Sequence, residues 1–435
     1  MLILNWTELD ADGRRKALAR PQLDSLQDVE QLARTIIKEV RHDGDAALLR
    51  YAERFDRARL EAIQVPPAEF DAAEKLLNAK QLSAIETAID NVRRFHAAQL
   101  AAPLSMEVMP GVRCERVYRP IPAVGLYVPA GSAPLPSTVI MVAVPASLAG
   151  CPERVLCTPP AADGRANAAV LAAARRCGIT KVYKAGGAQA IAAMAYGTAT
   201  IPKVDKIFGP GTALTTAAKQ IVAGDPAGAA CDLPAGPSEV LVIADDSANA
   251  TFVASDLLAQ AEHDVRSQAL LVTDSMQLAR SVAAEFHRQR GKLSRKSILQ
   301  ESSANCRIIV VPHLVMALQV SNDYAPEHLI VQTREPRALL DGIASAGSVF
   351  LGAWSPESMG DYCSGTNHVL PTYGYARAYS GLSLTDFQKR MTVQELTSDG
   401  LRLLGPVAET LASLEGLDAH ARAVTIRLEA LDAAP

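Results

Sequence analysis

The sequence lacks the residue patterns that mark several large classes of protein. Only 5% of its 435 residues are aromatic, and its seven cysteines are scattered with no Cys-x-x-Cys pair. This argues against a disulfide framework and against a thiolate zinc site. The net charge of -4 comes from interspersed acidic and basic residues, which leaves no basic stripe for nucleic acid and no polybasic patch for a membrane. We therefore expect neither a nucleic-acid nor a membrane partner.

Export and membrane insertion also lack support. The segment Met1-Leu-Ile-Leu-Asn-Trp6 reaches Glu8 and Asp10 too soon for the apolar region of a signal peptide. Two long uncharged stretches, 133–152 and 185–202, hold too many Pro, Ala, Gly, Ser and Thr residues to span a membrane. We expect buried helices and turns there, and a cytoplasmic protein with reduced cysteines.

Common catalytic and nucleotide-binding motifs are missing as well. There is no G-x-G-x-x-G, P-loop, G-x-S-x-G or H-E-x-x-H, so nucleotide hydrolysis, serine hydrolysis and zincin chemistry lose their usual support. Two glycine turns, 184–189 and 208–212, each follow a predicted strand and open a predicted helix. Such turns suit phosphate groups, but they leave the identity of a cofactor open.

The pattern of apolar residues along the chain predicts an α/β fold of several domains. Residues 24–100 have helical periodicity, and from Pro120 short apolar runs alternate with Ala-rich helical stretches, which is typical of βαβ units on a parallel sheet. After a turn-rich segment at 232–238, a second alternating series begins. The predicted strands are 123–128, 155–157, 181–183, 206–208, 239–244, 269–273, 307–311, 329–331 and 349–351, and the predicted helices are 137–148, 166–177, 188–196, 213–222, 249–263 and 275–289.

We thus predict two Rossmann-like parallel-sheet lobes, incomplete because G-x-G-x-x-G is missing, with a helical N-terminal region and a helical C-terminal tail. The predicted domains are 1–119, 120–236, 237–381 and 382–435. The tail helices are expected to break at Gly405-Pro406.

Four of the eight histidines lie in polar motifs near the C-terminus, at positions 263, 328, 368 and 420. Gln260 and His263 are three residues apart at the end of a predicted helix, so they share a face and could bind one ion. The alternative is that His263 only interacts with the helix dipole.

Glu327 and His328 place an acid and a base at the start of a predicted strand. Neighbouring strand residues face opposite sides, so both can face one cleft only if the turn led by Pro326 twists them. In that case, Glu327 could activate water while His328 moves another proton. The alternative is a solvated turn with a capping glutamate.

The polar, glycine-containing segment 358–368 is predicted to form a loop after a strand, where binding residues of α/β proteins often lie. Asp361 could ligate a metal and His368 could contact substrate. Cys363 could serve as a thiol nucleophile, but without an adjacent base a small filler residue fits better. Glu415 and His420 are too far apart for one helical face unless Gly416 marks a break, and their use would require the tail to reach back or to reach a partner subunit.

Taken together, these sequence motifs resemble those of the histidinol dehydrogenase family. The resemblance covers most of the chain and runs in order through 124–129, 185–189, 204–211, 234–240, 260–263, 325–328, 365–371, 387–391 and 414–420. It implies oxidation of L-histidinol through L-histidinal to L-histidine, the last step of histidine biosynthesis. The cofactors implied are two NAD+ molecules, reduced in turn, and one Zn2+ per site.

The resemblance also implies roles for individual residues. Gln260, His263, Asp361 and His420 would hold zinc, and this all-N/O set leaves positions for substrate. His328 would be the base and Glu327 would activate water, so these are the implied catalytic residues. Contacts with substrate would come from the zinc ligands, from His328, and from Ser238, His368 and Glu415.

For the cofactor, the resemblance implies that Tyr127, Gln189 and Thr212 line the NAD site in 120–236, and that 237–381 holds zinc and substrate. Thr212 departs from the family, which typically has Asn there, and a hydroxyl cannot reproduce the two-sided contact of an amide. Family members are intertwined homodimers whose tail, here 382–435, completes the partner's site.

Two other readings remain open from the sequence. One is a divergent NAD-dependent zinc dehydrogenase acting on another amino alcohol. The other is a two-lobed small-molecule binding protein, because two α/β lobes around a cleft suit that role; the Glu327-His328 pair and the lack of an export signal argue against it.

Overall fold

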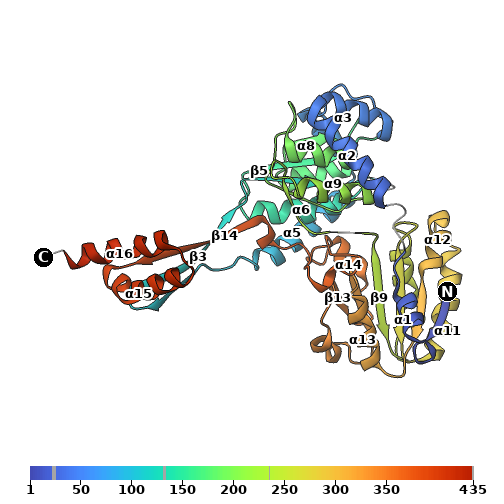
Figure 1. Ribbon diagram of the computed structural model, residues 1–435. Helices are drawn as coiled ribbons and strands as arrows, with labels where there is room; N and C mark the ends of the chain where they lie inside the picture. The colour runs from blue at the N-terminus through green and yellow to red at the C-terminus, as the bar shows by residue number, and fades with distance from the viewer. Residues whose placement is uncertain (22–25, 131–133, 235, 434–435) are drawn as a thin grey trace. The chain divides into compact units, whose positions relative to one another are not determined.

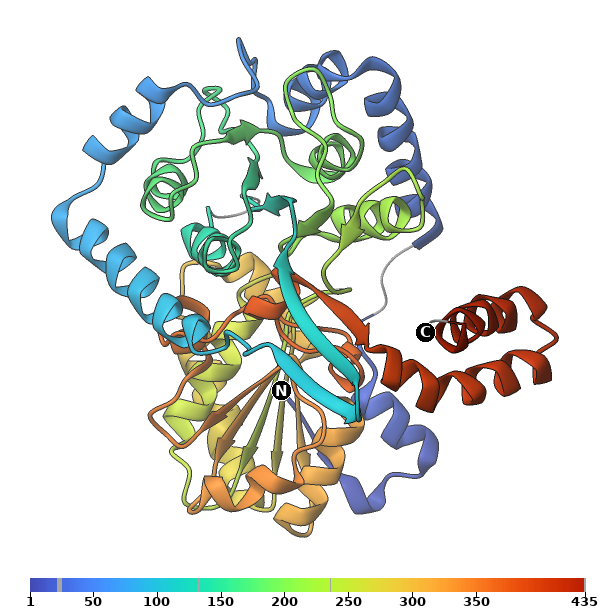
Figure 2. The same ribbon diagram turned by 90° about the vertical axis from the view of Figure 1, so that its left-hand side faces the viewer.

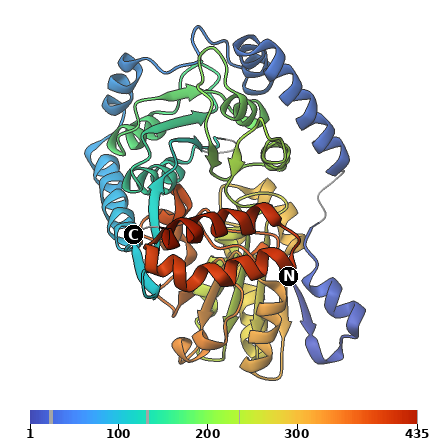
Figure 3. The same cartoon turned by 60° about the vertical axis from the view of Figure 1, so that its left-hand side comes forward.

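The structure describes residues 1–21, 26–130, 134–234 and 236–433. They form two compact units, here called the α/β unit (residues 1–99 and 121–387) and the tail unit (residues 100–120 and from 388 onward). Figure 1 shows this computed structural model with its elements labelled, and Figures 2 and 3 show two further views. In the described part of the chain, no helix is long and apolar enough to cross a membrane.

The first sheet of the α/β unit has five parallel strands in the order β6-β5-β4-β7-β8. The chain starts at the central strand β4, builds β5 and β6 on one side, and then returns to build β7 and β8 on the other. The strands are β4 (Ala123–Tyr127), β5 (Glu153–Thr158), β6 (Val182–Lys184), β7 (Lys206–Phe208) and β8 (Ala230–Cys231).

Helices cover both faces of this sheet, and its strands accordingly consist largely of apolar residues. The covering helices are α2 (Leu26–Asp43), α3 (Asp45–Tyr51), α4 (Pro67–Lys75), α5 (Ala79–Ala97), α6 (Pro136–Leu148), α7 (Ala168–Arg176), α8 (Gly187–Tyr196) and α9 (Ala213–Ala223). One core packs β4 against α5, α6 and α7, and the other packs α2 against α8 and α9. A short π-helical turn, Ala52–Asp56, follows α3.

The second sheet has six parallel strands in the order β1-β11-β10-β9-β12-β13, drawn side by side in Figure 2. The strands are β1 (Leu2–Asn5), β9 (Glu239–Ala244), β10 (Gln268–Thr273), β11 (Arg307–Val310), β12 (His328–Gln332) and β13 (Ser348–Leu351). The associated helices are α1 (Ala11–Leu18), α10 (Ala250–Ala261), α11 (Met276–Arg290), α12 (Lys296–Ser302), α13 (Leu314–Tyr324) and α14 (Glu357–Tyr362). The 3-10 turns are Trp6–Glu8, Ser303–Asn305, Pro336–Gly342, Tyr375–Arg377 and Leu384–Phe387.

The tail unit consists of an antiparallel sheet, β14-β3-β2, and a helical hairpin, both visible in Figure 3. The elements are β2 (Leu104–Met109), β3 (Val112–Pro120), β14 (Gln388–Leu396), α15 (Ser398–Leu414) and α16 (Asp418–Asp432). Few of its side chains are buried, and every residue of β2 is exposed.

The predicted fold class, two parallel-sheet lobes with helices at both ends, is confirmed. Two local expectations were wrong. Residues 388–396 form β14 instead of helix, and α15 runs through Gly405-Pro406 without a break. At position 405 an added Cβ would lie 3.0 Å from a Val424 methyl carbon and 3.1 Å from one of Leu428, so glycine permits α16 to pack closely there. The predicted domain limits at 119, 236 and 381 stay a prediction.

Candidate active site

Glu327 and His328 lie together at the amino end of β12, where the turn before them brings both side chains to one place. Ala325, which caps α13, has a left-handed backbone (φ 54°), and Pro326 follows it. Glu327 Oε2 is 3.6 Å from His328 Nδ1, and the two residues are only 6% and 3% exposed. The alternative of a solvated turn is therefore excluded.

The backbone of Glu239, the first residue of β9, holds both members of the pair. Its N–H donates to Glu327 Oε2 at 2.9 Å, and its carbonyl oxygen lies 3.3 Å from His328 Nδ1. The carbonyl can only accept, so Nδ1 carries a proton. Nε2 faces a carboxylate, which also only accepts, so this arrangement suits the protonated ring, and only the deprotonated ring has its lone pair on Nε2. Nε2 lies 3.2 Å from Oδ1 of Asp361, on α14.

Electrostatics couple these groups strongly. Burial raises the pKa of Glu327, against the lowering effect of His328 and the Glu239 N–H. Desolvation lowers the pKa of His328, but the carboxylates of Glu327 and Asp361 outweigh it, so the net shift is upward. The pocket thus concentrates negative charge, and a cationic ligand would relieve it.

Gln260, at the end of α10, provides independent support for a ligand-binding site. It is 0% exposed, and neither its Oε1 nor its Nε2 has a hydrogen-bond partner. An unpartnered buried polar group costs about 1–3 kcal/mol. The amide is therefore placed for a ligand that lies outside the protein chain.

The other predicted ligands of the α/β unit, His263 and Asp361, interact electrostatically with each other. His263 follows the C-cap of α10, with its N–H donating to the Gln260 carbonyl at 3.2 Å. Desolvation lowers the pKa of the His263 imidazole, whereas Asp361 raises it and His328 lowers it. Within the described ranges, no group of three or more His, Cys, Asp or Glu side chains is arranged to hold a metal ion. The predicted set of zinc ligands differs from such a group, because it includes a glutamine, Gln260, and a residue of the tail unit, His420.

The segment after α14 is fixed from several sides. His368 Nδ1 lies 2.7 Å from the Asp361 carbonyl oxygen, to which it donates, and Nε2 lies 3.1 Å from Thr138 Oγ1. The structure differs from the expectation of a loop here, because 357–362 form α14. Cys363 packs as a partly buried residue against the core, in keeping with a filler residue.

The remaining predicted substrate contacts lie in different places. Ser238 is partly buried and directly precedes Glu239. Glu415 caps α15 and His420 lies in α16, and both are exposed in the tail unit.

Two buried acids near the site were not predicted from the sequence. Glu357 is 1% exposed, both its carboxylate oxygens lack a partner, and burial raises its pKa well above the usual value. Asp256 accepts from Gln332 Nε2 at 2.6 Å, and burial raises its pKa to about 7. Each precedes a predicted ligand, Asp361 or Gln260, by four residues on the same helix, and that spacing could have revealed them.

Two of the predicted cofactor residues, Tyr127 and Thr212, lie at the carboxyl ends of β4 and β7, where the strand order of the first sheet reverses, and Gln189 lies in α8, after β6. Ligands of open α/β sheets bind at such a switch point. Tyr127 ends β4, is buried, and accepts a hydrogen bond from the Gly187 N–H at 2.9 Å. Gln189 is buried with Oε1 unpartnered, and Thr212 is exposed as the N-cap of α9.

The turn after β7 is held rigidly. The Gly209 N–H donates to Asp232 Oδ2 at 2.7 Å, while Lys219 donates to the Gly209 carbonyl at 2.9 Å and pairs with Asp232. An added Cβ at Gly209 would lie 2.1 Å from the Tyr127 carbonyl oxygen. This close approach of two chain segments requires glycine.

A surface groove of about 1430 Å³ lies elsewhere, along α2 and α9. Its lining includes Arg41, Tyr196 and Asp225 but none of the predicted site residues. The chemistry of the buried groups, rather than the size of this groove, identifies the site.

Comparison with known proteins agrees with this arrangement. The family model described as histidinol dehydrogenase matches residues 18–428. The chain is 54% identical to histidinol dehydrogenase of Vibrio cholerae over 99% of each chain, and 52% identical to that of Campylobacter jejuni over 99% of this chain and 100% of the other. The crystal structure of histidinol dehydrogenase from Elizabethkingia anophelis superposes with a TM-score of 0.95 at 45% identity, covering 100% of this chain and 99% of that one. The chain belongs to the histidinol dehydrogenase family, a family of oxidoreductases.

Proposed function

We propose that the protein catalyses the NAD-dependent, four-electron oxidation of L-histidinol through L-histidinal to L-histidine. The observation that carries the proposal is the buried Glu327-His328 pair, held on the backbone of Glu239 and directed at Asp361. Family membership supports the choice of substrate.

His328 acts as the base in both oxidations. Because Nδ1–H faces the Glu239 carbonyl, the deprotonated ring has its lone pair on Nε2, which takes the hydroxyl proton as the substrate carbon gives up a hydride. NAD+, when bound, supplies the hydride acceptor. Loss of one proton and one hydride turns the alcohol into the aldehyde.

Glu327 acts between the two oxidations. Its carboxylate removes a proton from water as the oxygen attacks the aldehyde carbon. The proton that His328 took in the first oxidation passes to the former carbonyl oxygen, which completes the hydrate and restores His328 as a base. His328 then takes a hydroxyl proton of the hydrate as the second hydride leaves. In sum, the alcohol, one water and two NAD+ give the carboxylate, two NADH and three protons.

The residues present also suit the implied zinc ion. The unpartnered amide of Gln260, with His263 and Asp361, would hold it in the α/β unit together with His420 of a second copy. When bound, zinc would hold the imidazole and amino groups of the substrate in place. The buried Asp361 carboxylate favours positive charge at this location: burial alone would raise its pKa, but the interaction with His328 holds that pKa below its usual value.

We infer that a homodimer forms through the tail unit. Along α15, Leu403, Val407, Leu411 and Leu414 are 53%, 51%, 55% and 79% exposed, and their spacing puts them on one helical face. Such an apolar stripe is typical of an interface. The same unit carries Glu415 and His420, which would complete the partner's site.

The proposal is tested by following NADH after L-histidinol is added to the purified protein, with zinc measured in the same preparation. We expect NADH formation that is lost on chelation and in His328→Asn. Other amino alcohols tested side by side should react far more slowly. Preference for one of them, or full activity of His328→Asn, would contradict the proposal.

A further inference from the structure

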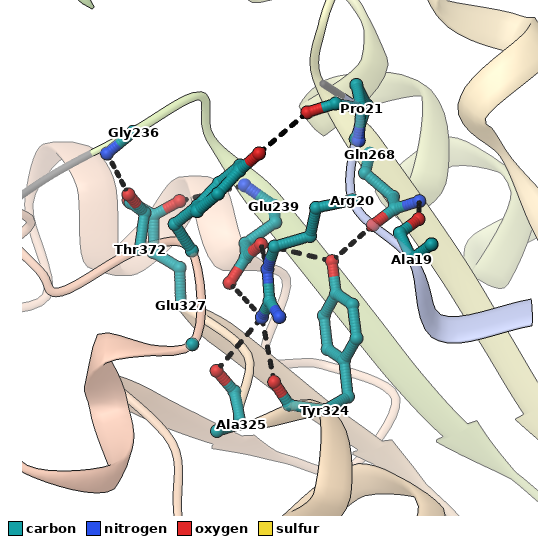
Figure 4. Close-up of polar contacts among 12 residues, drawn as sticks. Ala19, Arg20, Pro21, Gly236, Glu239, Gln268, Tyr324, Ala325, Glu327 and Thr372 are labelled. Carbon is teal, nitrogen blue, oxygen red and sulfur yellow. Dashed lines mark hydrogen bonds and ion pairs between the residues drawn. The ribbon is translucent and has the colours of Figure 1, made fainter. Parts of the chain in front are cut away.

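Glu239 has a side chain whose role is separate from that of its backbone. The backbone N–H and carbonyl hold Glu327 and His328, whereas the carboxylate points the other way, into a network of buried polar groups (Figure 4). The start of β9 can hold Glu327 and His328 in place only if Glu239 is itself fixed. The groups that bind the Glu239 carboxylate are therefore important to the site.

Arg20 binds that carboxylate with both arms of its guanidinium. Nε donates to Glu239 Oε2 at 2.6 Å and Nη2 donates to Oε1 at 2.8 Å. The two side chains are 12% and 2% exposed. A bidentate pair of this kind fixes direction as well as charge, which lysine cannot reproduce.

The same guanidinium also holds the turn that precedes Glu327. Nη2 donates to the carbonyl oxygens of Tyr324, at 2.7 Å, and Ala325, at 3.4 Å (Figure 4). Ala325 has a positive φ, which is a costly conformation for a residue with a Cβ. Arg20 thus contacts both chain segments, β9 and the turn, that meet at the catalytic pair.

Tyr324 completes the network. Its ring lies 4.0 Å from the Arg20 guanidinium carbon, and its hydroxyl is 3.1 Å from Glu239 Oε2 and 2.8 Å from Gln268 Oε1. Gln268 Nε2 in turn donates to the Ala19 carbonyl at 3.0 Å. The N-terminal segment that carries Arg20 is therefore fastened to the second sheet.

The positive charge of Arg20 also compensates the buried negative charge of Glu239. Glu239 is a buried carboxylate next to the buried Glu327. Without Arg20 it would be an uncompensated charge, and breaking such a buried pair is strongly unfavourable. Arg20 pairs with this charge, which raises the pKa of Glu327, so the Arg20 cation opposes that effect.

We propose that Arg20 is a positioning residue for the reaction: through Glu239 and the carbonyls of Tyr324 and Ala325, it fixes the turn that presents Glu327 and His328. This inference rests on the proposed function of that pair. Arg20 itself does not touch either member of the pair in the contacts described, so it acts through Glu239 and the turn.

The test measures kcat and KM for L-histidinol with Arg20→Met and Arg20→Lys in the full-length, zinc-loaded protein, normalised to bound zinc. For Arg20→Met we expect kcat to fall on the order of 10- to 100-fold, because small misplacement of catalytic groups is costly. KM should change by less than about threefold, since substrate contacts remain. Arg20→Lys should recover part of the loss.

Arg307→Met is the matched control. Arg307 donates to the carbonyls of Lys16, Ala17 and Ala19, at 2.9, 2.7 and 3.2 Å, so it fastens the same N-terminal segment without touching Glu239. Its kcat should stay near that of the wild type. An equal loss in Arg307→Met would show a general structural role and overturn the inference.

The double variant Arg20→Met/Glu239→Gln gives a second test that avoids a buried unpaired charge. If Arg20 acts through Glu239, the double variant should lose no more kcat than the worse single variant. Losses that multiply, or wild-type kcat in Arg20→Met, would contradict the inference. A wild-type protein inactive on L-histidinol would instead contradict the proposed function, so the two failures are distinguishable.

Discussion

At the residue scale, the site consists of buried groups whose partners are backbone atoms. Glu327 and His328 both depend on the main chain of Glu239, which fixes the Glu327 carboxylate and directs His328 Nε2 at Asp361. Because Glu327 and His328 carry out different proton transfers, we expect that a substitution can impair one transfer without the other.

Glu327→Gln should separate the two oxidation steps. The amide oxygen can still accept from the Glu239 N–H, but it cannot take a proton from water. We expect the oxidation of added histidinal to slow by about 10²- to 10⁴-fold, with a smaller effect on histidinol oxidation. Stopped-flow NADH traces with each substrate measure this. The control is Glu285→Gln, at a partly exposed glutamate that pairs with Arg288. An equal loss on both substrates would argue against the division.

Glu357 predicts a pH dependence of stability. Its folded pKa lies well above the unfolded value, so the folded protein keeps a proton that the unfolded chain releases. Stability should then decline as pH rises above about 4.5, by up to about 1.4 kcal/mol per pH unit until the folded pKa is reached. Glu357→Gln cannot titrate, so its unfolding free energy in chelator should exceed that of the wild type by more at pH 9 than at pH 5.

Asp256→Asn provides the comparison for that measurement. Its carboxyl has a folded pKa of about 7, so the difference from the wild type should stop growing near that pH. A Glu357→Gln difference that is independent of pH would contradict an uncompensated buried carboxyl at position 357.

At the element scale, the first sheet depends on a close approach between β4 and the turn after β7. Gly209→Ala would push a methyl group into the Tyr127 carbonyl, 2.1 Å away. We expect KM for NAD to rise on the order of tenfold, because the turn at the switch point must move. Gly150→Ala also sits at a positive φ but has open space around it, so it should cost only about 1–2 kcal/mol of stability and leave KM unchanged.

Most strands of the two sheets could be predicted from the sequence because each is a short apolar run followed by a helical period. The edge strands β1 and β8 were not predicted. Glu239–Ala244 is fully buried, and it coincides with its predicted limits. The tail strands β2 and β14 could not be found this way, because their side chains are exposed almost throughout. Without a buried face, a strand leaves no alternating pattern.

The site was predictable only to the level of its motifs. The spacing of Gln260 and His263 indicated that they share a helix end. Only the folded chain shows that Glu239 connects Glu327 with Arg20, because Arg20 and Glu239 are 219 residues apart in the sequence. Glu357 escaped detection because one acidic residue near a helix start resembles an ordinary surface residue. Its burial is a tertiary property.

At the scale of the whole molecule, completion of each site by a second subunit predicts complementation. His328→Asn and His420→Asn should each be inactive alone. After unfolding and refolding together, half the dimers should be mixed, and each mixed dimer should contain one intact site. Random assortment then gives about a quarter of the wild-type activity. No recovery despite mixed dimers, shown by tagged subunits, would contradict the shared site.

The most direct test of the central claim is the stoichiometry of the full reaction. With limiting L-histidinol and excess NAD+, zinc-loaded protein should form two NADH per histidinol and yield L-histidine, measured by absorbance and by chromatography of the product. One NADH per histidinol with histidinal as the end product, or no NADH at all, would contradict the account of a single site that carries out both oxidations.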